Sequence, residues 1–123
     1  MSEDTLELAR HGFAAWQRGD FETIEAILDP NVWWHWFEAG EWDCNGREDV
    51  MRTLRERYDD GLARAPLELI DVGDDVVVAV VHPRDAGDEW PPETATLITF
   101  HDGKVVSMED HRTRDDAMAS VLA

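Results

Sequence analysis

Cysteine is nearly absent from this chain of 123 residues, since Cys44 is the only one. No internal disulfide can form, and a cytoplasmic location is the default expectation for such a chain. Basic residues are scarce as well: 11 Lys and Arg stand against 28 Asp and Glu, which gives a formal net charge of −17. Because a field of that sign repels phosphate backbones and anionic lipid headgroups, we expect neither a nucleic acid nor a membrane as a partner.

Long apolar runs are also missing. No stretch approaches the roughly 18 apolar residues that a membrane-spanning helix needs, and the acidic segment 1–10 has no apolar run of the signal-peptide kind. No internal repeat or low-complexity segment divides the sequence. The length fits one domain, predicted over residues 1–123, and a hydrophobic content of 43% is enough for a core.

Tryptophan, in contrast, is abundant and clustered. Four of the six tryptophans fall in residues 31–46, NVWWHWFEAGEWDCNG, and His35 lies among them. A tryptophan side chain favours burial, and its indole N–H needs a hydrogen-bond partner. The segment therefore marks a place where a large aromatic surface surrounds one titratable ring.

Apolar residues at helical spacing predict three helices in the first half of the chain. They cover residues 2–17, 21–28 and 47–62. The turn at Gly19 separates the first two helices, and Pro30 ends the second, because proline cannot continue the helical hydrogen-bond ladder. The second half of the chain has a different pattern.

β-branched and aromatic residues predict one strand after the second helix and four more after the third. The expected strands are 32–37, 67–72, 76–82, 93–100 and 104–112, and a short terminal helix is expected at 115–122. This order of elements predicts an α+β domain. A cone-shaped, curved antiparallel β-sheet would pack against three N-terminal helices and enclose a pocket.

Several of these segments resemble the nuclear transport factor 2-like superfamily, and within it the SnoaL-like group, which is named after a polyketide cyclase. The resemblance is carried by AWQRGD at 15–20, LDPNV at 28–32, Gly46 and GKVV at 103–106. It implies the cone fold, a pocket for a small molecule and a homodimer. It does not imply a reaction, because this fold hosts isomerases, cyclases, dehydratases, epoxide hydrolases and plain binding modules.

The ketosteroid isomerases of this superfamily allow a comparison of single positions. The resemblance places His35 where the isomerase has its catalytic carboxylate base. The tyrosine that donates to the oxyanion falls on Gly12, and the second, protonated acid falls on Thr96. Because both oxyanion donors are missing, we do not expect steroid isomerisation.

Strand alternation sorts the aromatic segment into two faces. If His35 points into the cavity, Trp33 and Phe37 do so too, and Trp34 and Trp36 face the other way. An apolar pair on the outer face of a lone domain would remain in contact with water, so this arrangement predicts a homodimer. The resemblance turns further side chains inward: Val78, Val80, His82, Met108, Asp110 and Arg112 from later strands, with Phe13, Trp16 and Tyr58 approaching from the helices.

These placements define a candidate site. His35 and Asp110 are the catalytic candidates, because a histidine oriented by a carboxylate suits general base catalysis near neutral pH. The substrate-contacting candidates are Trp16, Trp33, Tyr58, His82, Thr96, Met108 and Arg112. Purely structural roles remain open for several of these residues. His35 and His82 would be packed histidines, and Asp110 would form a salt bridge with Arg112. Cys44 would be a structural thiol, and Trp42 and Trp90 would anchor loops.

A metal centre is not expected. His35, His82 and Asp110 have suitable ligand types, but the chain has no short histidine pair, so all three would have to converge from different strands. Two functions remain open. One is an enzyme that moves a proton on a small apolar molecule without a cofactor, by isomerisation, cyclisation, dehydration or hydration. The other is a non-catalytic binding or dimerisation module of the same fold.

Overall fold

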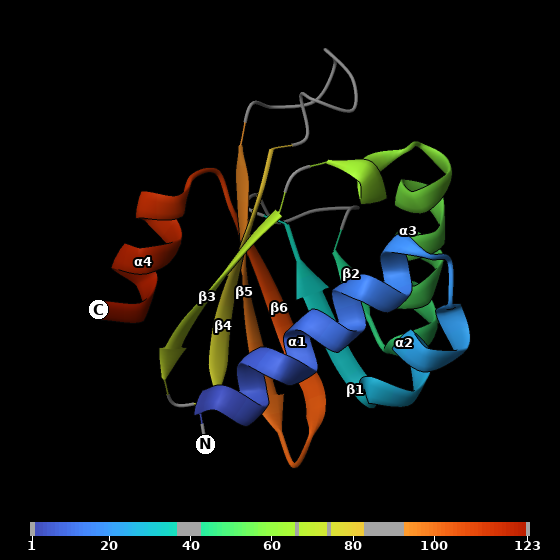
Figure 1. Ribbon diagram of the computed structural model, residues 1–123, viewed down its shortest axis with the longest axis horizontal. Helices are drawn as coiled ribbons and strands as arrows, with labels where there is room; N and C mark the ends of the chain where they lie inside the picture. Colours follow the sequence, from blue (N-terminus) through green and yellow to red (C-terminus); the bar gives the residue numbers. More distant parts are fainter. Residues whose placement is uncertain (1, 37–42, 66, 74, 83–92, 123) are drawn as a thin grey trace.

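The computed structural model describes residues 2–36, 43–65, 67–73, 75–82 and 93–122 (Figure 1). Phe37, Trp42, Trp90 and the loop predicted at 83–92 lie outside the described residues. None of the described helices combines the length and the apolar composition that crossing a bilayer demands.

Four α-helices and one 3-10 helix form within these residues. They are α1 (Ser2–Gln17), α2 (Phe21–Ile27), α3 (Arg47–Asp59), η1 (Leu62–Arg64) and α4 (Arg114–Leu122). Asp20 caps α2, because its side chain accepts a hydrogen bond from the backbone N–H of Thr23 at 3.3 Å. The predicted third helix ends earlier than expected, at Asp59, because Gly61 takes a left-handed conformation with φ 86°.

Six strands form one sheet in the order β2-β1-β6-β5-β4-β3. They are β1 (Leu28–His35), β2 (Cys44–Asn45), β3 (Leu67–Gly73), β4 (Val76–Val81), β5 (Thr94–His101) and β6 (Lys104–His111). The sheet is mixed rather than antiparallel throughout, because β1 runs parallel to β6 while the other neighbours are antiparallel. The meander of the last four strands brings β6 beside β1 in the same direction.

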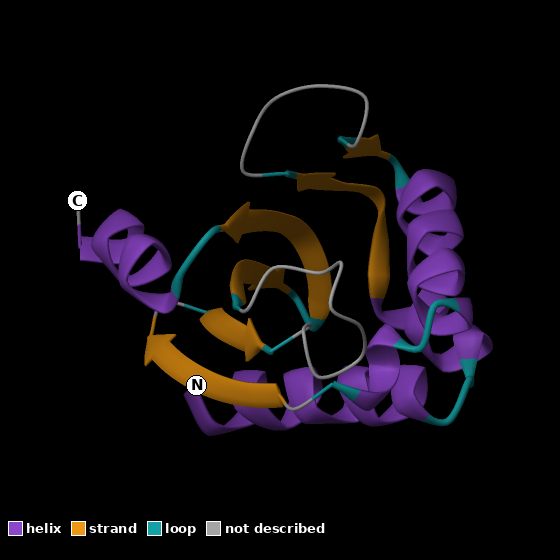
Figure 2. Cartoon of the chain, turned by 90° about the horizontal axis from the view of Figure 1, so that it is seen from above, coloured by secondary structure: helices purple, strands orange, loops and turns teal. Residues whose placement is uncertain are grey.

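Helices cover both faces of the curved sheet. Contacts join α1 to β3 and α3 to β1, while α4 packs on the other face against β4, β5 and β6 (Figures 1 and 2). The main core lies under the N-terminal helices and includes Val32, Met51 and Val77. The α+β cone predicted from the sequence is confirmed.

A second, smaller core lies beneath α4. Its buried members are Val78, Val80, Ala95 and Ala117. The inward orientation expected for Val78 and Val80 is therefore wrong, because it is Val77 and Ala79 that face the main core. Strand β4 is apolar at every position because α4 covers the face that would otherwise meet water.

Candidate functional site

The two faces of β1 are the reverse of those expected. Trp34 is buried in the main core with 7% of its surface exposed. Trp33 and His35 lie on the opposite face, where their rings are 4.3 Å apart and His35 is exposed. The inward orientation expected for Trp33 and His35 is therefore wrong. The alternation itself holds, because Val32 and Trp34 are buried while Trp33 and His35 are not. The error lay in the assumption that His35 is one of the residues that point inward.

Asp110 faces the interior, and Met108 lies two residues before it on the same face of β6. Both residues are buried, as predicted, with 6% and 8% of their surface exposed. The Oδ1 atom of Asp110 accepts two hydrogen bonds, from Nε1 of Trp34 at 2.8 Å and from Oγ1 of Thr96 at 2.7 Å. Thr96 is the partner of Asp110 in the β5–β6 pairing.

Burial raises the pKa of Asp110, because a low-dielectric environment disfavours its charged form. The positive charge of Arg57 and the two hydrogen bonds from Trp34 and Thr96 act in the opposite direction and lower this pKa, but they do not cancel the effect of burial. The carboxyl group of Asp110 is thus held by fixed donors in a place that favours its protonated form.

The proposed hydrogen bond between His35 and Asp110 does not form. His35 pairs with Glu109 in the β1–β6 register, so it lies on the face opposite Asp110. The Oδ1 atom of Asp110 is already bound to Trp34 and Thr96. His35 and Asp110 both border an open polar hollow of about 390 Å³ at the ends of β1 and β6, but they reach it from different faces. The catalytic pair expected from the sequence is therefore wrong.

Arg57 is the member of this cluster that the sequence analysis missed. Its guanidinium lies 4.4 Å from the ring centre of Trp34 and 5.4 Å from that of Trp36. Burial lowers the pKa of Arg57, and the nearby Asp110 carboxyl raises it again. One sequence pattern could have revealed it, because Arg57 lies three and seven residues after Leu54 and Val50 on the stripe of α3 that faces the core.

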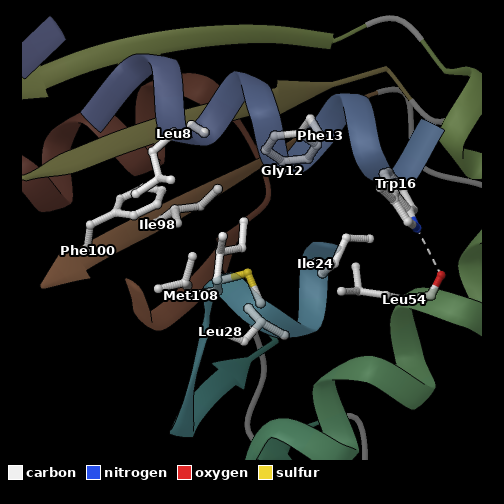
Figure 3. Close-up of a pocket in the computed structure, with 13 residues that line it drawn as sticks. Leu8, Gly12, Phe13, Trp16, Ile24, Leu28, Leu54, Ile98, Phe100 and Met108 are labelled. Carbon is white, nitrogen blue, oxygen red and sulfur yellow. Dashed lines mark hydrogen bonds between the residues drawn. The ribbon is translucent and has the colours of Figure 1, made fainter. Parts of the chain in front are cut away.

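An apolar cavity of about 70 Å³ lies between α1, α2, α3 and the sheet (Figure 3). Its lining is Leu8, Ala9, Gly12, Phe13, Trp16, Ile24, Ile27, Leu28, Leu54, Ile98, Phe100, Val105 and Met108. Trp16 is fixed at one end, where its Nε1 donates a hydrogen bond to the backbone oxygen of Leu54 at 2.9 Å. Trp16 and Met108 line this cavity, and their contact with a substrate stays a prediction. The volume is far below the roughly 300–1,000 Å³ typical of pockets for drug-sized ligands.

The other substrate-contacting candidates do not line this cavity. Tyr58 packs edge-on against Phe21, with ring centres 5.5 Å apart. His82 is exposed just after the end of β4, and Arg112 is exposed just after the end of β6. Arg112 borders the polar hollow beside Asp110. Among the described residues, no three His, Cys, Asp or Glu side chains form a group that could hold a metal ion.

This arrangement, a curved sheet with helices on its concave side and a small interior cavity, is that of the nuclear transport factor 2-like proteins. The SnoaL-like domain family matches residues 9–108, so the chain belongs to that family. The match ends two residues before Asp110. No curated protein matches the sequence.

Solved structures support the same fold. A protein called Bal32a from a soil-derived mobile gene cassette is 22% identical, with 89% of each chain covered and a TM-score of 0.68. A candidate ketosteroid isomerase from Kribbella flavida DSM 17836 is 23% identical, with 88% of this chain and 76% of that chain covered and a TM-score of 0.65. A de novo designed protein with a curved β-sheet is 16% identical over 98% of this chain and 93% of its own, with a TM-score of 0.69.

Proposed function

We propose that this protein binds a small, mostly apolar molecule inside the cone, and that Asp110 transfers a proton at the polar end of that site. The reaction class would be a cofactor-independent isomerisation, cyclisation or dehydration. The observation that carries the proposal is the position of Asp110. It is a buried carboxyl held by Trp34 and Thr96, two residues along β6 from Met108, which lines the apolar cavity.

The hydrogen bonds to Asp110 suit proton transfer. Trp34 and Thr96 both donate to Oδ1, and no described residue donates to Oδ2. The carboxyl group is therefore fixed in orientation, while Oδ2 can gain or lose a proton. A raised pKa brings a carboxyl closer to the pH at which a general acid or base works best.

Steroid isomerisation is outside this proposal. Gly12, which resembles the position of the isomerase's oxyanion-binding tyrosine, lines the cavity. A Cβ atom at Gly12 would lie 2.8 Å from Cδ1 of Ile27, so a tyrosine would need Ile27 to move. A cavity of about 70 Å³ is also too small for a four-ring skeleton.

A non-catalytic binding module is the second candidate. It is favoured by the lining of the cavity, in which every one of the 13 residues is apolar or glycine. A ligand held wholly within that lining would meet no titratable side chain. The two candidates therefore differ in whether the bound molecule reaches Asp110.

Toluene binding tests the cavity itself. We expect toluene to bind and to change the fluorescence of Trp16, which lies in the lining. Ala9→Leu adds three carbon atoms to a side chain that lines the cavity and should abolish binding. Ala14→Leu makes the same change at an exposed position of α1 and should leave binding intact. Equal binding by the two variants would contradict a ligand in this cavity.

Proton exchange separates the enzyme from the binding module. We expect the protein to accelerate exchange of the α-protons of cyclopentanone with D₂O, measured by NMR, and Asp110→Asn to lower that rate by about 100-fold, the lower end of general acid–base effects. Toluene binding without accelerated exchange would favour the binding module.

A homodimer also remains a proposal, but its basis changes. Trp34 packs inside its own core, so it cannot form an outer apolar pair with Trp36. An interface would have to lie on the outer face of β1, where Trp33 is half-buried and His35 is exposed. Light scattering at micromolar concentration measures the state directly, and Trp33→Glu should convert a dimer held by this face into a monomer.

A further inference from the structure

Arg57 differs from the arginines that the protein places on its surface. Arg10, Arg18, Arg52 and Arg114 each pair with a carboxylate and are about half exposed or more. Arg57 is half-buried, yet no described residue accepts a hydrogen bond from it. A buried arginine is normally paired.

The stacking of Arg57 leaves its donors available. Its guanidinium meets the faces of Trp34 and Trp36, at 4.4 Å and 5.4 Å from their ring centres. The five N–H donors of a guanidinium lie in its plane, so contacts to its face do not satisfy them. Two aromatic rings thus fix the cation, while no described residue accepts a hydrogen bond from its edges.

Asp110 lies close enough to Arg57 to shift its pKa, but it accepts no hydrogen bond from the guanidinium. Each of the two groups shifts the pKa of the other, yet they form no direct ion pair. Trp34 lies between them, with its ring face against Arg57 and its Nε1–H donated to Asp110. The site therefore presents a cation that no described residue pairs with, on the face of one indole, and a carboxyl oxygen at the N–H edge of the same indole.

We propose that Arg57 is the specificity-determining residue of this site and binds a carboxylate of the ligand, so that the ligand is a small apolar acid. This inference rests on the proposed function, because it assumes that a small molecule enters the cone. The flat guanidinium edge matches the two oxygens of a carboxylate. No described residue donates to Oδ2 of Asp110, which leaves this oxygen for a further polar contact with the ligand.

The overall charge makes this recognition specific. A protein with a formal charge of −17 repels an acid at long range. A preference for the acid over its neutral analogue must therefore come from a local cation in a poorly hydrated place, where electrostatic interactions are strong.

Benzoate and benzamide form a matched pair of probes, since they share shape and differ in charge. We expect the wild-type protein to bind benzoate about ten-fold more tightly than benzamide at pH 7, as measured by calorimetry. Arg57→Gln should remove this preference and leave the benzamide affinity within two-fold, roughly the error of such comparisons. Arg57→Lys keeps the charge without the planar fork and should retain an intermediate preference.

Arg52→Gln is the control. Arg52 lies on the same helix, is exposed and pairs with Asp49. The variant loses a positive charge of the same size and should keep the full preference for benzoate. If Arg57→Gln fails to fold, the comparison of Arg57→Lys with the wild type still tests whether the planar guanidinium is needed for the preference for benzoate.

The outcomes separate the two proposals. If toluene binds but benzoate is not preferred to benzamide, the role of Arg57 is wrong and the apolar cavity stands. A preference that survives Arg57→Gln, or one that Arg52→Gln removes equally, also overturns the role of Arg57. If neither toluene nor the aromatic pair binds, the proposed function fails and the inference falls with it.

Discussion

Trp33 and Trp34 are neighbours in the chain and differ in almost everything else. Trp34 is buried, donates to Asp110 and supports Arg57. Trp33 lies on the outer face, half-buried, beside the exposed ring of His35. The inner face combines burial with charged groups, whereas the outer face places its titratable groups nearer to water. Residue type alone therefore says little about role, and the face of the strand decides it.

The first prediction contrasts the two tryptophans directly. Trp34→Ala should lower the free energy of unfolding by about 3–5 kcal/mol, because it opens a cavity and removes a donor from Asp110. Trp33→Ala should cost about 1 kcal/mol, since its ring is already partly in water. Urea denaturation measures both, and similar losses for the two variants would contradict the assignment of faces.

The second prediction makes the same contrast with threonines of β5. Thr96→Val keeps the side-chain shape but removes a hydrogen bond to the buried Asp110, and should cost about 1–3 kcal/mol. Thr99→Val on the outer face should change stability by less than about 0.5 kcal/mol. The difference in unfolding free energy at pH 7 is the readout, and an unaffected Thr96→Val protein would argue against the hydrogen bond.

The third prediction uses pH. The pKa of Asp110 is raised, so the folded chain binds this proton more tightly than the unfolded chain. The resulting stabilisation is fully present below the ordinary value of 3.8 and is lost as pH rises through the raised pKa. Relative to wild type, Asp110→Asn should therefore become more stable as pH rises, in denaturation curves between about pH 3 and pH 8.

The control for this titration is Asp20, whose pKa is lowered by its hydrogen bonds to Thr23. Its stabilisation is present at neutral pH and is lost as pH falls through the lowered pKa. Asp20→Asn should therefore show a pH trend of the opposite sign, becoming relatively more stable as pH falls. Trends of the same sign for the two variants would exclude a raised pKa at Asp110.

The smallest effect is expected at His35. It is exposed on the outer face, so His35→Ala should change the unfolding free energy by about 0.5 kcal/mol or less. The same variant should leave the fluorescence of Trp34 unchanged, because His35 does not share a face with it. A large loss of stability would restore the idea that His35 is packed in the interior.

The fold was largely predictable, because helical spacing, turn residues and the resemblance agreed with one another. The parallel pairing of β1 with β6 was not predictable, because strand patterns do not encode which strands become neighbours. The face of each β1 residue was not predictable either. The run VWWHWF has no polar alternation to mark an inner side, so the sequence did not show which alternate residues face the core.

The candidate site was predicted in part for related reasons. The inward orientation of Met108 and Asp110 was implied by the resemblance, and the structure buries both residues. Thr96 is the partner of Asp110 in the pairing of β5 with β6. Arg57 could not be assigned, because an arginine on a helix is ordinarily interpreted as exposed. Its burial depends on two tryptophans from a strand that is distant in sequence.

The bond between Trp34 and Asp110 also bears on how the protein is made. The two residues are 76 positions apart, and β1 pairs in parallel with β6, the last strand to be synthesised. Until the ribosome has released that strand, the indole of Trp34 has no carboxyl to bind and one edge of β1 has no partner. We therefore expect the nascent chain to keep its aromatic segment exposed through most of translation, which makes it a natural client for chaperones.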